Sequence, residues 1–160
     1  MDLQLLQQTH GGGLVALAHG VAALGRVDGR IGADGAQRVA QLGHFAAFEK
    51  VLPLFGLDAL VVDVLVNNAG FGYDARFVES DMARQRELIL TNDLALVELT
   101  GEFAPGMAER KCGGILNVAS VAGFMPGPGM ATYYASKAFV QSFSQAIHDE
   151  LRRTGVHVSA

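Results

Sequence analysis

Three apolar runs in the second half of the chain predict the strands of a sheet. Residues 60–66 (L-V-V-D-V-L-V) are mostly β-branched, residues 115–119 form a second run, and residues 156–160 begin a third. Nearly continuous runs of this kind are typical of parallel strands that are buried on both faces. The pattern therefore predicts a parallel sheet.

The segment between the first two runs shows hydrophobic residues at helical spacing. Ser80 or Asp81 can cap a helix whose apolar stripe continues through Glu109. We expect Pro105 to break this helix late, because proline removes a backbone hydrogen bond. The glycine pair at residues 113–114 is expected to separate the helix from the next strand.

A second helix is expected over residues 132–153, followed by Gly155 as the residue after its C-terminus. Residues 57–160 therefore alternate β-α-β-α-β. This order predicts an α/β fold in which helices pack on the faces of a parallel sheet through right-handed crossovers.

Residues 1–56 show weaker patterns. Residues 14–18 are either a strand or a buried helix turn, because so short an apolar run does not distinguish the two. Residues 27–35 are expected to form a loop and residues 36–52 a helix. We divide the chain into a divergent or atypical N-terminal segment, residues 1–56, and a partial α/β domain, residues 57–160.

Composition and charge narrow the class of protein. A chain of 160 residues can bury a core, and its net charge of −4, with scattered basic residues, argues against a nucleic-acid partner. Cys112 is the only cysteine, so we expect no disulfide and a cytoplasmic, reducing location. The five histidines lack metal-ligand spacing, so we expect no metal. We expect no membrane association, since the apolar residues 14–24 fall short of the ~20 that a bilayer span needs.

Three side chains near the second predicted strand have types suited to acid–base chemistry. Ser120 follows the strand, and Tyr133 and Lys137 lie four residues apart, on one face of the second helix. The turn N-N-A-G at residues 67–70 follows the first strand. Because the carboxyl ends of parallel strands meet at one edge of a sheet, we expect all four features to lie on the same rim.

The Tyr133–Lys137 pair has a chemical rationale. A free phenol has a pKa of about 10 and is a poor base at neutral pH. A nearby ammonium group favours the phenolate and lowers that pKa. Tyr133 could then exchange a proton with a carbonyl or alcohol oxygen. Tyr134 has Ala138 at the equivalent spacing, so we assign it to packing or to a pocket wall.

Taken together, these motifs resemble the short-chain dehydrogenase/reductase family. The matching pieces are the N-N-A-G turn, Asn92 in the following helix, Ser120, and the Y-x-x-x-K pair that begins thirteen residues after Ser120. The resemblance covers about residues 57–160. It implies a Rossmann-like parallel sheet with flanking helices, incomplete at both ends, and an NAD(P)-dependent oxidoreductase.

The resemblance also implies a role for each catalytic residue. Tyr133 would be the acid or base, Ser120 would orient the substrate oxygen, and Lys137 would be the charge partner of Tyr133. Asn92 would hold a water that relays protons to Lys137. From the residues alone, Ser120 and Asn92 are also explained by hydrogen bonds to local backbone.

The same resemblance implies a groove for NAD or NADP. Asn67, Ala69 and Gly70 would line it, and Tyr133 and Lys137 would contact the nicotinamide side of the cofactor. The glycine-rich pyrophosphate motif that the family places after its first strand is not found in this sequence. Residues that would separate NAD from NADP are likewise not identified.

Two functions follow from this comparison. The first is hydride transfer between a nicotinamide and a small-molecule alcohol or carbonyl substrate. The alternative is a non-catalytic truncated fragment, or an interaction module, with a fold derived from the family. The family pattern further suggests a homo-oligomer through the helices that contain Asn92 and Tyr133. The loop at residues 123–130 either forms an apolar pocket wall or packs on its own core.

Overall fold

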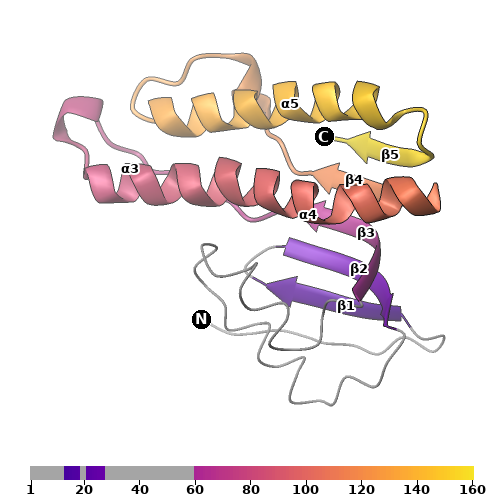
Figure 1. The fold of residues 1–160 in the computed structure, drawn as a ribbon. Helices are drawn as coiled ribbons and strands as arrows, with labels where there is room; N and C mark the ends of the chain where they lie inside the picture. The colour runs from indigo at the N-terminus through magenta and orange to yellow at the C-terminus, as the bar shows by residue number, and fades with distance from the viewer. Residues whose placement is uncertain (1–12, 19–20, 28–59) are drawn as a thin grey trace.

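The computed structural model describes residues 13–18, 21–27 and 60–160, in which one sheet is covered by helices (Figure 1). Its five strands lie in the order β1-β2-β3-β4-β5. They are β1 (Gly13–Ala18), β2 (Val21–Val27), β3 (Leu60–Asn67), β4 (Gly113–Asn117) and β5 (Val156–Ser159).

The strands β3, β4 and β5 are parallel, which confirms the predicted parallel sheet. Their register places Ile115 between Leu65 and Val158. The strand β4 begins at Gly113, so the glycine pair does not separate helix from strand as expected. A Cβ on Gly113 would lie 2.6 Å from the Met107 side chain, so glycine lets the strand start directly beneath a helix. The strand also ends at Asn117, before Ser120.

The N-terminal strands run antiparallel to their neighbours. Residues 14–18, which the pattern left open, belong to β1. This strand pairs antiparallel with β2, and β2 pairs antiparallel with β3. Ala18, Val21 and Asn67 therefore lie side by side at one edge of the sheet. As a result, β1 points toward the same edge as β3, and β2 points away from it.

The first expected helix is a continuous rod with a π-helical turn near its middle. Asp81 caps it, because its Oδ1 accepts a hydrogen bond from the Ala83 N–H at 2.8 Å. Pro105 lies inside this rod and does not end it, which corrects our expectation. Pro105 and Gly101, four residues before it, are both exposed, so water can solvate the backbone groups that proline leaves unpaired. The parts of the rod are α3 (Met82–Ile89), the π turn η5 (Leu90–Leu94) and α4 (Ala95–Arg110), and a short 3-10 turn η4 (Phe77–Glu79) precedes it.

The second expected helix is α5 (Ala131–Leu151), preceded by the 3-10 turn η6 (Val121–Phe124). Gly155 lies beyond its C-terminus with a φ of 83°, in the left-handed region that favours glycine. A Cβ there would lie 2.3 Å from the Lys111 carbonyl oxygen, so this turn also requires glycine for space.

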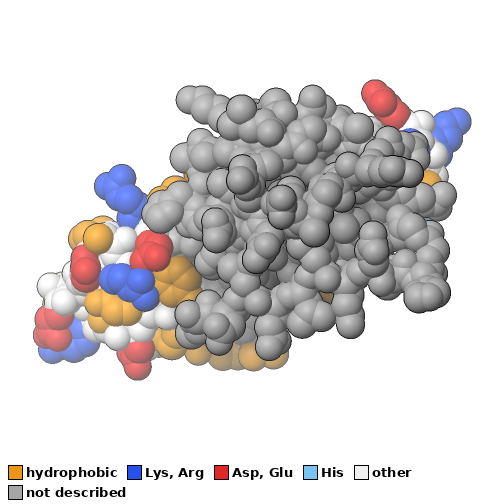
Figure 2. All heavy atoms as spheres, turned by 90° about the horizontal axis from the view of Figure 1, so that it is seen from below, with side chains coloured by type: hydrophobic (Ala, Val, Ile, Leu, Met, Phe, Trp, Pro, Cys, Tyr) orange, Lys and Arg blue, Asp and Glu red, His pale blue; other side chains and the backbone are white. Residues whose placement is uncertain are grey.

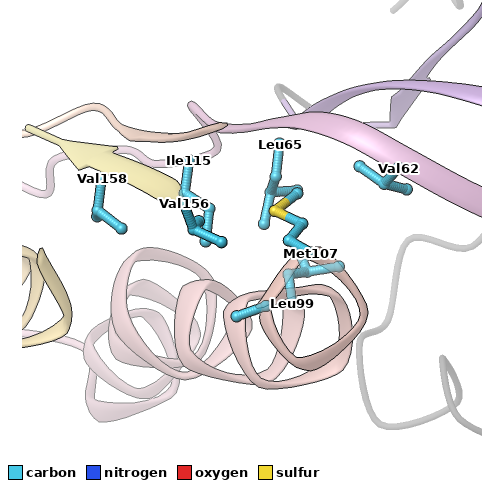
Figure 3. Packing of buried hydrophobic residues seen from close by; sticks show 8 residues of the cluster. Val62, Leu65, Leu99, Met107, Ile115, Val156 and Val158 are labelled. Carbon is cyan, nitrogen blue, oxygen red and sulfur yellow. The ribbon is translucent and has the colours of Figure 1, made fainter. Parts of the chain in front are cut away.

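The helices pack on one face of the parallel strands. Side chains from β3, β4 and β5 meet Leu99 and Met107 of α4 in the core (Figure 3). On the opposite face Leu116 and Val118 are exposed, at 41% and 36%. The strand members of the core are Val62, Leu65, Ile115, Val156 and Val158.

The end of the molecule that contains α3 has a mixed surface, on which acidic, basic and hydrophobic side chains are interspersed (Figure 2). Two ion pairs, Arg76–Glu79 and Arg84–Glu87, lie there. All four side chains are more than half exposed, so the pairs add little stability.

Two sequence expectations fall on residues that the structure does not describe. These are the loop over residues 27–35, apart from Val27 itself, and the helix over residues 36–52. The boundary at residue 57 also falls among them and stays a prediction. Within the described residues, no helix is both long enough and apolar enough to cross a membrane.

Candidate active site

The strands β3 and β4 bring the two predicted motifs to one rim. Asn67 and Asn117 are paired at the carboxyl ends of these strands. One residue further, the Val118 N–H donates to the Asn67 carbonyl at 2.9 Å. The loops after both strands therefore leave the sheet together, as the parallel pattern predicts.

The Asn67 side chain does not line this rim. It is buried, and its Nδ2 donates to Asn117 Oδ1 at 2.8 Å. Asn117 in turn donates to Ser144 Oγ of α5 at 2.9 Å, and Thr100 of α4 lies 3.4 Å from Asn67 Nδ2. These groups form a buried polar network that ties the strand ends to both helices. The side chain of Asn67 thus lies in the interior, where it helps to hold the two strand ends together.

Lys137 projects from α5 onto the rim. Lys137 is only 7% exposed, and its Nζ donates a hydrogen bond to the Val118 carbonyl at 2.8 Å. A Cβ built on Gly70 would lie 3.4 Å from Lys137 Nζ and 3.1 Å from Asn92 Oδ1. The missing side chain at Gly70 therefore leaves the backbone of the N-N-A-G turn open beside the ammonium group. Ala69, next to it, packs against the core.

Asn92 clamps the loop that follows β3. Its Oδ1 accepts from the Phe71 N–H at 3.0 Å, and its Nδ2 donates to the Phe71 carbonyl at 3.1 Å. The Nδ2 also donates to Ser136 Oγ at 3.0 Å, and Ser136 donates to the Tyr133 carbonyl at 2.7 Å. Asn92 is 1% exposed. It thus couples the loop after β3 to the first turn of α5, and its role in a proton relay stays a prediction.

Ser120 caps the turn η6. Its Oγ accepts a hydrogen bond from the Ala122 N–H at 3.2 Å. Gln141 of α5 donates to the Ser120 carbonyl at 3.1 Å and fixes the backbone. Because the Oγ acts as an acceptor in the cap, the hydroxyl proton stays available for donation to another oxygen. The local backbone bond and an orienting role are therefore compatible.

Tyr133 lies in the first turn of α5, one helical turn before Lys137. Its side chain is partly buried, and in the described part of the chain its hydroxyl makes no hydrogen bond. The ring of Tyr134 stands edge-on to that of Tyr133, with centroids 6.1 Å apart. Tyr134 also fills the space at Gly127, where a Cβ would lie 2.2 Å from its ring. Tyr134 thus packs against its own loop, and the phenol of Tyr133 stays free.

Sequence reasoning missed Asp93, which follows Asn92 in the π turn. Burial raises the pKa of its carboxyl from 3.8 to about 6, and the Lys137 charge partly offsets this. Burial lowers the pKa of Lys137, and the Asp93 charge opposes that shift. The polar triplet Thr91-Asn92-Asp93 interrupts an otherwise apolar stretch of the helix, and that interruption was the available signal.

A cavity of ≈ 840 Å³ adjoins this rim and begins at Ser120. It follows α5 past Gln141 and Gln145 toward His148, with the ends of β4 and β5 opposite. Phe124 lines it, but Tyr133 and Lys137 do not. Phe124 and Met125 are exposed, at 76% and 56%, so the loop at residues 123–130 does not pack these side chains on a core of its own.

The rim has groups suited to the nicotinamide side of a dinucleotide. Lys137 presents an ammonium beside the open backbone of Gly70, and the Tyr133 phenol lies one helical turn before Lys137, with its ring beside Gly72. Hydroxyl groups of a ribose are natural partners for a lysine ammonium, which offers three donors. The residues Gly70, Tyr133 and Lys137 therefore fit that half of NAD or NADP.

The described N-terminal strands do not provide a pyrophosphate loop at this rim. The usual loop joins the carboxyl end of a strand to a helix N-terminus. Here β1 ends at Ala18 and the chain enters β2 at Val21, which leaves too few residues for a helix. The other strand, β2, ends at the opposite edge of the sheet.

Comparison with known proteins gives consistent matches. The family model for short chain dehydrogenases matches residues 25–160. A very-long-chain 3-oxoacyl-CoA reductase of Phaeosphaeria nodorum is 41% identical over 104 residues, which cover 64% of this chain and 30% of that protein. The chain thus spans about a third of the length of such relatives.

Solved structures agree with the sequence comparisons. A short-chain dehydrogenase from Sphingobium yanoikuyae in complex with NADPH matches with a TM-score of 0.60 and 38% identity, over 62% of this chain and 39% of that one. A bulky-bulky ketone specific alcohol dehydrogenase from Comamonas testosteroni matches with a TM-score of 0.60 and 37% identity, over the same shares. With the family model covering most of its length, the chain belongs to the short-chain dehydrogenase family.

Proposed function

We propose that this chain is the catalytic part of an NAD(P)-dependent oxidoreductase that interconverts an alcohol and a carbonyl compound. One observation supports this proposal above the others. The Lys137 ammonium is buried at the rim, bonded to the Val118 carbonyl at 2.8 Å, one helical turn from the free phenol of Tyr133. A buried ammonium beside a phenol is arranged to stabilise negative charge on oxygen.

Each residue has a distinct part in the proposed reaction. Tyr133 gives its proton to the carbonyl oxygen during reduction, or takes a proton from the alcohol during oxidation. Ser120 donates its free hydroxyl hydrogen to the same substrate oxygen and thereby orients it. Lys137 stabilises the charge on Tyr133 after proton transfer. Asn92 holds the Phe71 loop and the start of α5 in register.

The nicotinamide cofactor supplies the hydride or accepts it. Gly70 and Lys137 would hold its ribose side, where the open backbone and the ammonium lie together. The names of relatives point to the substrate class, because several are very-long-chain 3-oxoacyl-CoA reductases. We therefore propose a carbonyl compound of the 3-oxoacyl thioester type as the substrate to test first.

The antiparallel β2 beside β3 favours the second candidate, a non-catalytic member of the fold. Within the described strands, this arrangement places no strand-to-helix loop at the rim, where the pyrophosphate of a dinucleotide would bind. Under this alternative the rim residues keep their geometry but bind cofactor too weakly for turnover.

The experiment compares the purified chain with Tyr133→Phe and Tyr134→Phe. NADPH and NADH binding is measured by cofactor fluorescence, and reduction of a 3-oxoacyl thioester by loss of absorbance of the reduced nicotinamide. We expect Tyr133→Phe to lower turnover by about 10²–10⁴-fold with little change in cofactor affinity. Tyr134→Phe removes a hydroxyl from a ring that packs against Gly127, and this variant should retain most activity.

The two candidate functions give different outcomes. Turnover that depends on Tyr133 supports the oxidoreductase. A folded chain that binds neither cofactor at millimolar concentration supports the non-catalytic alternative. Equal turnover in the wild-type chain and Tyr133→Phe would remove Tyr133 from the mechanism.

A further inference from the structure

Ser136 precedes Lys137 on α5 and is 2% exposed, so its hydroxyl is withdrawn from water. This hydroxyl donates to the Tyr133 carbonyl at 2.7 Å and accepts from Asn92 Nδ2 at 3.0 Å. A hydroxyl has one hydrogen, and here that hydrogen is used toward the backbone of the helix. The side of the oxygen that faces the π turn η5 is therefore an acceptor, which requires a donor from Asn92.

The carboxamide of Asn92 uses both of its Nδ2 hydrogens. One is donated to the Phe71 carbonyl at 3.1 Å, and the other to Ser136 Oγ at 3.0 Å. Its Oδ1 accepts from the Phe71 N–H at 3.0 Å. The loop after β3 thus supplies two of these three bonds, and Ser136 supplies the one that ties the carboxamide to α5.

The orientation of this carboxamide decides which of its atoms faces the proposed cofactor groove. A Cβ on Gly70 would lie 3.1 Å from Asn92 Oδ1 and 3.4 Å from Lys137 Nζ. The amide oxygen therefore borders the same small space as the ammonium, and its partial negative charge suits that positive charge. A reversed carboxamide would present an NH₂ group to this space and would set its oxygen against the Phe71 carbonyl.

We propose that Ser136 is a positioning residue that holds the Asn92 carboxamide on α5 with its oxygen toward Gly70. Two buried bonds in series, from Asn92 to Ser136 and from Ser136 to the helix backbone, fix the spacing between the loop after β3 and the start of α5. The inference rests on the proposed function for its effect on catalysis, whereas the geometry is measured without cofactor.

The same helix offers a matched control about two turns later. Ser144 is also 2% exposed, donates to the Val140 carbonyl at 2.6 Å and accepts from Asn117 Nδ2 at 2.9 Å. It repeats the local chemistry of Ser136 with a different asparagine. Ser136→Ala and Ser144→Ala therefore remove equivalent hydroxyl groups, and only the first should change the surroundings of Asn92.

The test follows hydrogen exchange of side-chain amides by NMR in the full chain labelled with ¹⁵N at asparagine Nδ2. The chain has four asparagines, at positions 67, 68, 92 and 117, and Asn92→Ala identifies the signal of interest. In the wild-type chain, both Nδ2 hydrogens of Asn92 should exchange much more slowly than those of exposed Asn68, because both are bonded and buried. Ser136→Ala should speed exchange at Asn92 by about tenfold, through the loss of one hydrogen bond. Ser144→Ala should leave Asn92 unchanged.

Ser136→Thr is the conservative variant, because a threonine hydroxyl in a helix can make the same bond to a carbonyl three residues earlier. It should restore slow exchange at Asn92. The inference is overturned if the Asn92 amide of the wild-type chain exchanges as fast as that of Asn68. It is also overturned if folded Ser136→Ala keeps the wild-type exchange rate at Asn92.

Activity gives a second readout. In a chain that turns over, Ser136→Ala should lower kcat by about tenfold, since small displacements of reacting groups slow the chemical step. Ser136→Thr and Ser144→Ala should keep kcat near the wild-type value, and equal losses in the two alanine variants would contradict the positioning role. The exchange measurements require neither cofactor nor substrate. Failure of the proposed function therefore leaves them intact, and their failure leaves Tyr133 chemistry untouched.

Discussion

Gly70 shows how one missing side chain can define a site. The space beside its backbone is bounded by Asn92 and Lys137, both buried. Its φ is not in the left-handed region, so backbone conformation does not require glycine here, and the open space beside it supports the proposed contact with a cofactor.

Gly70→Ala should lower cofactor affinity by about tenfold, because the new methyl group would fill the space beside the ammonium and press on Asn92. Fluorescence titration with NADPH measures this change. Gly101→Ala is the control, since a Cβ there has nothing within 4 Å. Equal losses in both variants would show that the effect comes from the fold and not from the site.

The raised pKa of Asp93 should make the free energy of unfolding depend on pH. The folded chain raises the pKa of this carboxyl, so between pH 3.8 and about 6 it binds more protons than the unfolded chain. The free energy of unfolding should therefore fall as the pH rises through this window and stay lower above it. Urea unfolding at several pH values should show this fall in the wild-type chain and a smaller one in Asp93→Asn.

The spacing of residues in the sequence pointed to some of the polar side chains at the rim and not to others. Ser120, Tyr133 and Lys137 stand out in the sequence because their types and separations are distinctive, and their catalytic roles stay predictions. Asn67 was expected in the groove, but its side chain points into the interior, which depends on strand register. Asp93 was missed because its importance comes from burial and from Lys137, 44 residues later in the chain.

At the element scale, helix α5 and strands β3 and β4 form the support for the site. The buried network of Asn67, Asn117 and Ser144 joins them. The apolar runs predicted these strands and their parallel order, because buried parallel strands need continuous hydrophobic sequence. Pro105 was expected to break the helix and does not. It is exposed on α4, so water can replace the backbone hydrogen bond that proline removes.

Asn117→Ala should destabilise the chain by about 1–3 kcal/mol, because it removes the buried bonds to Asn67 and Ser144 and leaves Asn67 Nδ2 with only its 3.4 Å contact to Thr100. Chemical unfolding measures this difference. Asn68→Ala replaces an exposed asparagine in the neighbouring turn and should cost much less. Similar values for the two variants would contradict the structural role of the network.

At the scale of the whole molecule, the helical layer leaves hydrophobic side chains in solvent. Ile89, Leu90 and Leu94 are 44–47% exposed on the first helical rod, and Phe139 of α5 is 40% exposed and stacks on Phe143 at 5.8 Å. These side chains support the proposal that two copies associate through this layer.

Leu94→Glu should weaken that association, because it places a charge in an apolar contact. Sedimentation velocity of the wild-type chain and this variant measures it. Glu102→Gln, an exposed position on the same helix, should leave the distribution unchanged. A wild-type chain that sediments as a monomer at all concentrations would contradict the proposal.

The sheet itself was only partly predictable at this scale. The parallel half over β3, β4 and β5 followed from β-α-β-α-β alternation. The antiparallel pairing of β1 and β2 did not, because short apolar runs specify neither direction nor neighbour. The described strands of this half provide no pyrophosphate loop at the rim.

Transfer of deuterium from the cofactor to a product distinguishes an oxidoreductase from a non-catalytic member of the fold. The purified chain is incubated with NADPH or NADH deuterated at C4 of the nicotinamide and with a 3-oxoacyl thioester, and the product is analysed by mass spectrometry. We expect a hydroxyacyl product with one deuterium at the new carbinol carbon, formed by Tyr134→Phe and almost absent with Tyr133→Phe. A folded wild-type chain that yields no deuterated alcohol with either cofactor would contradict it.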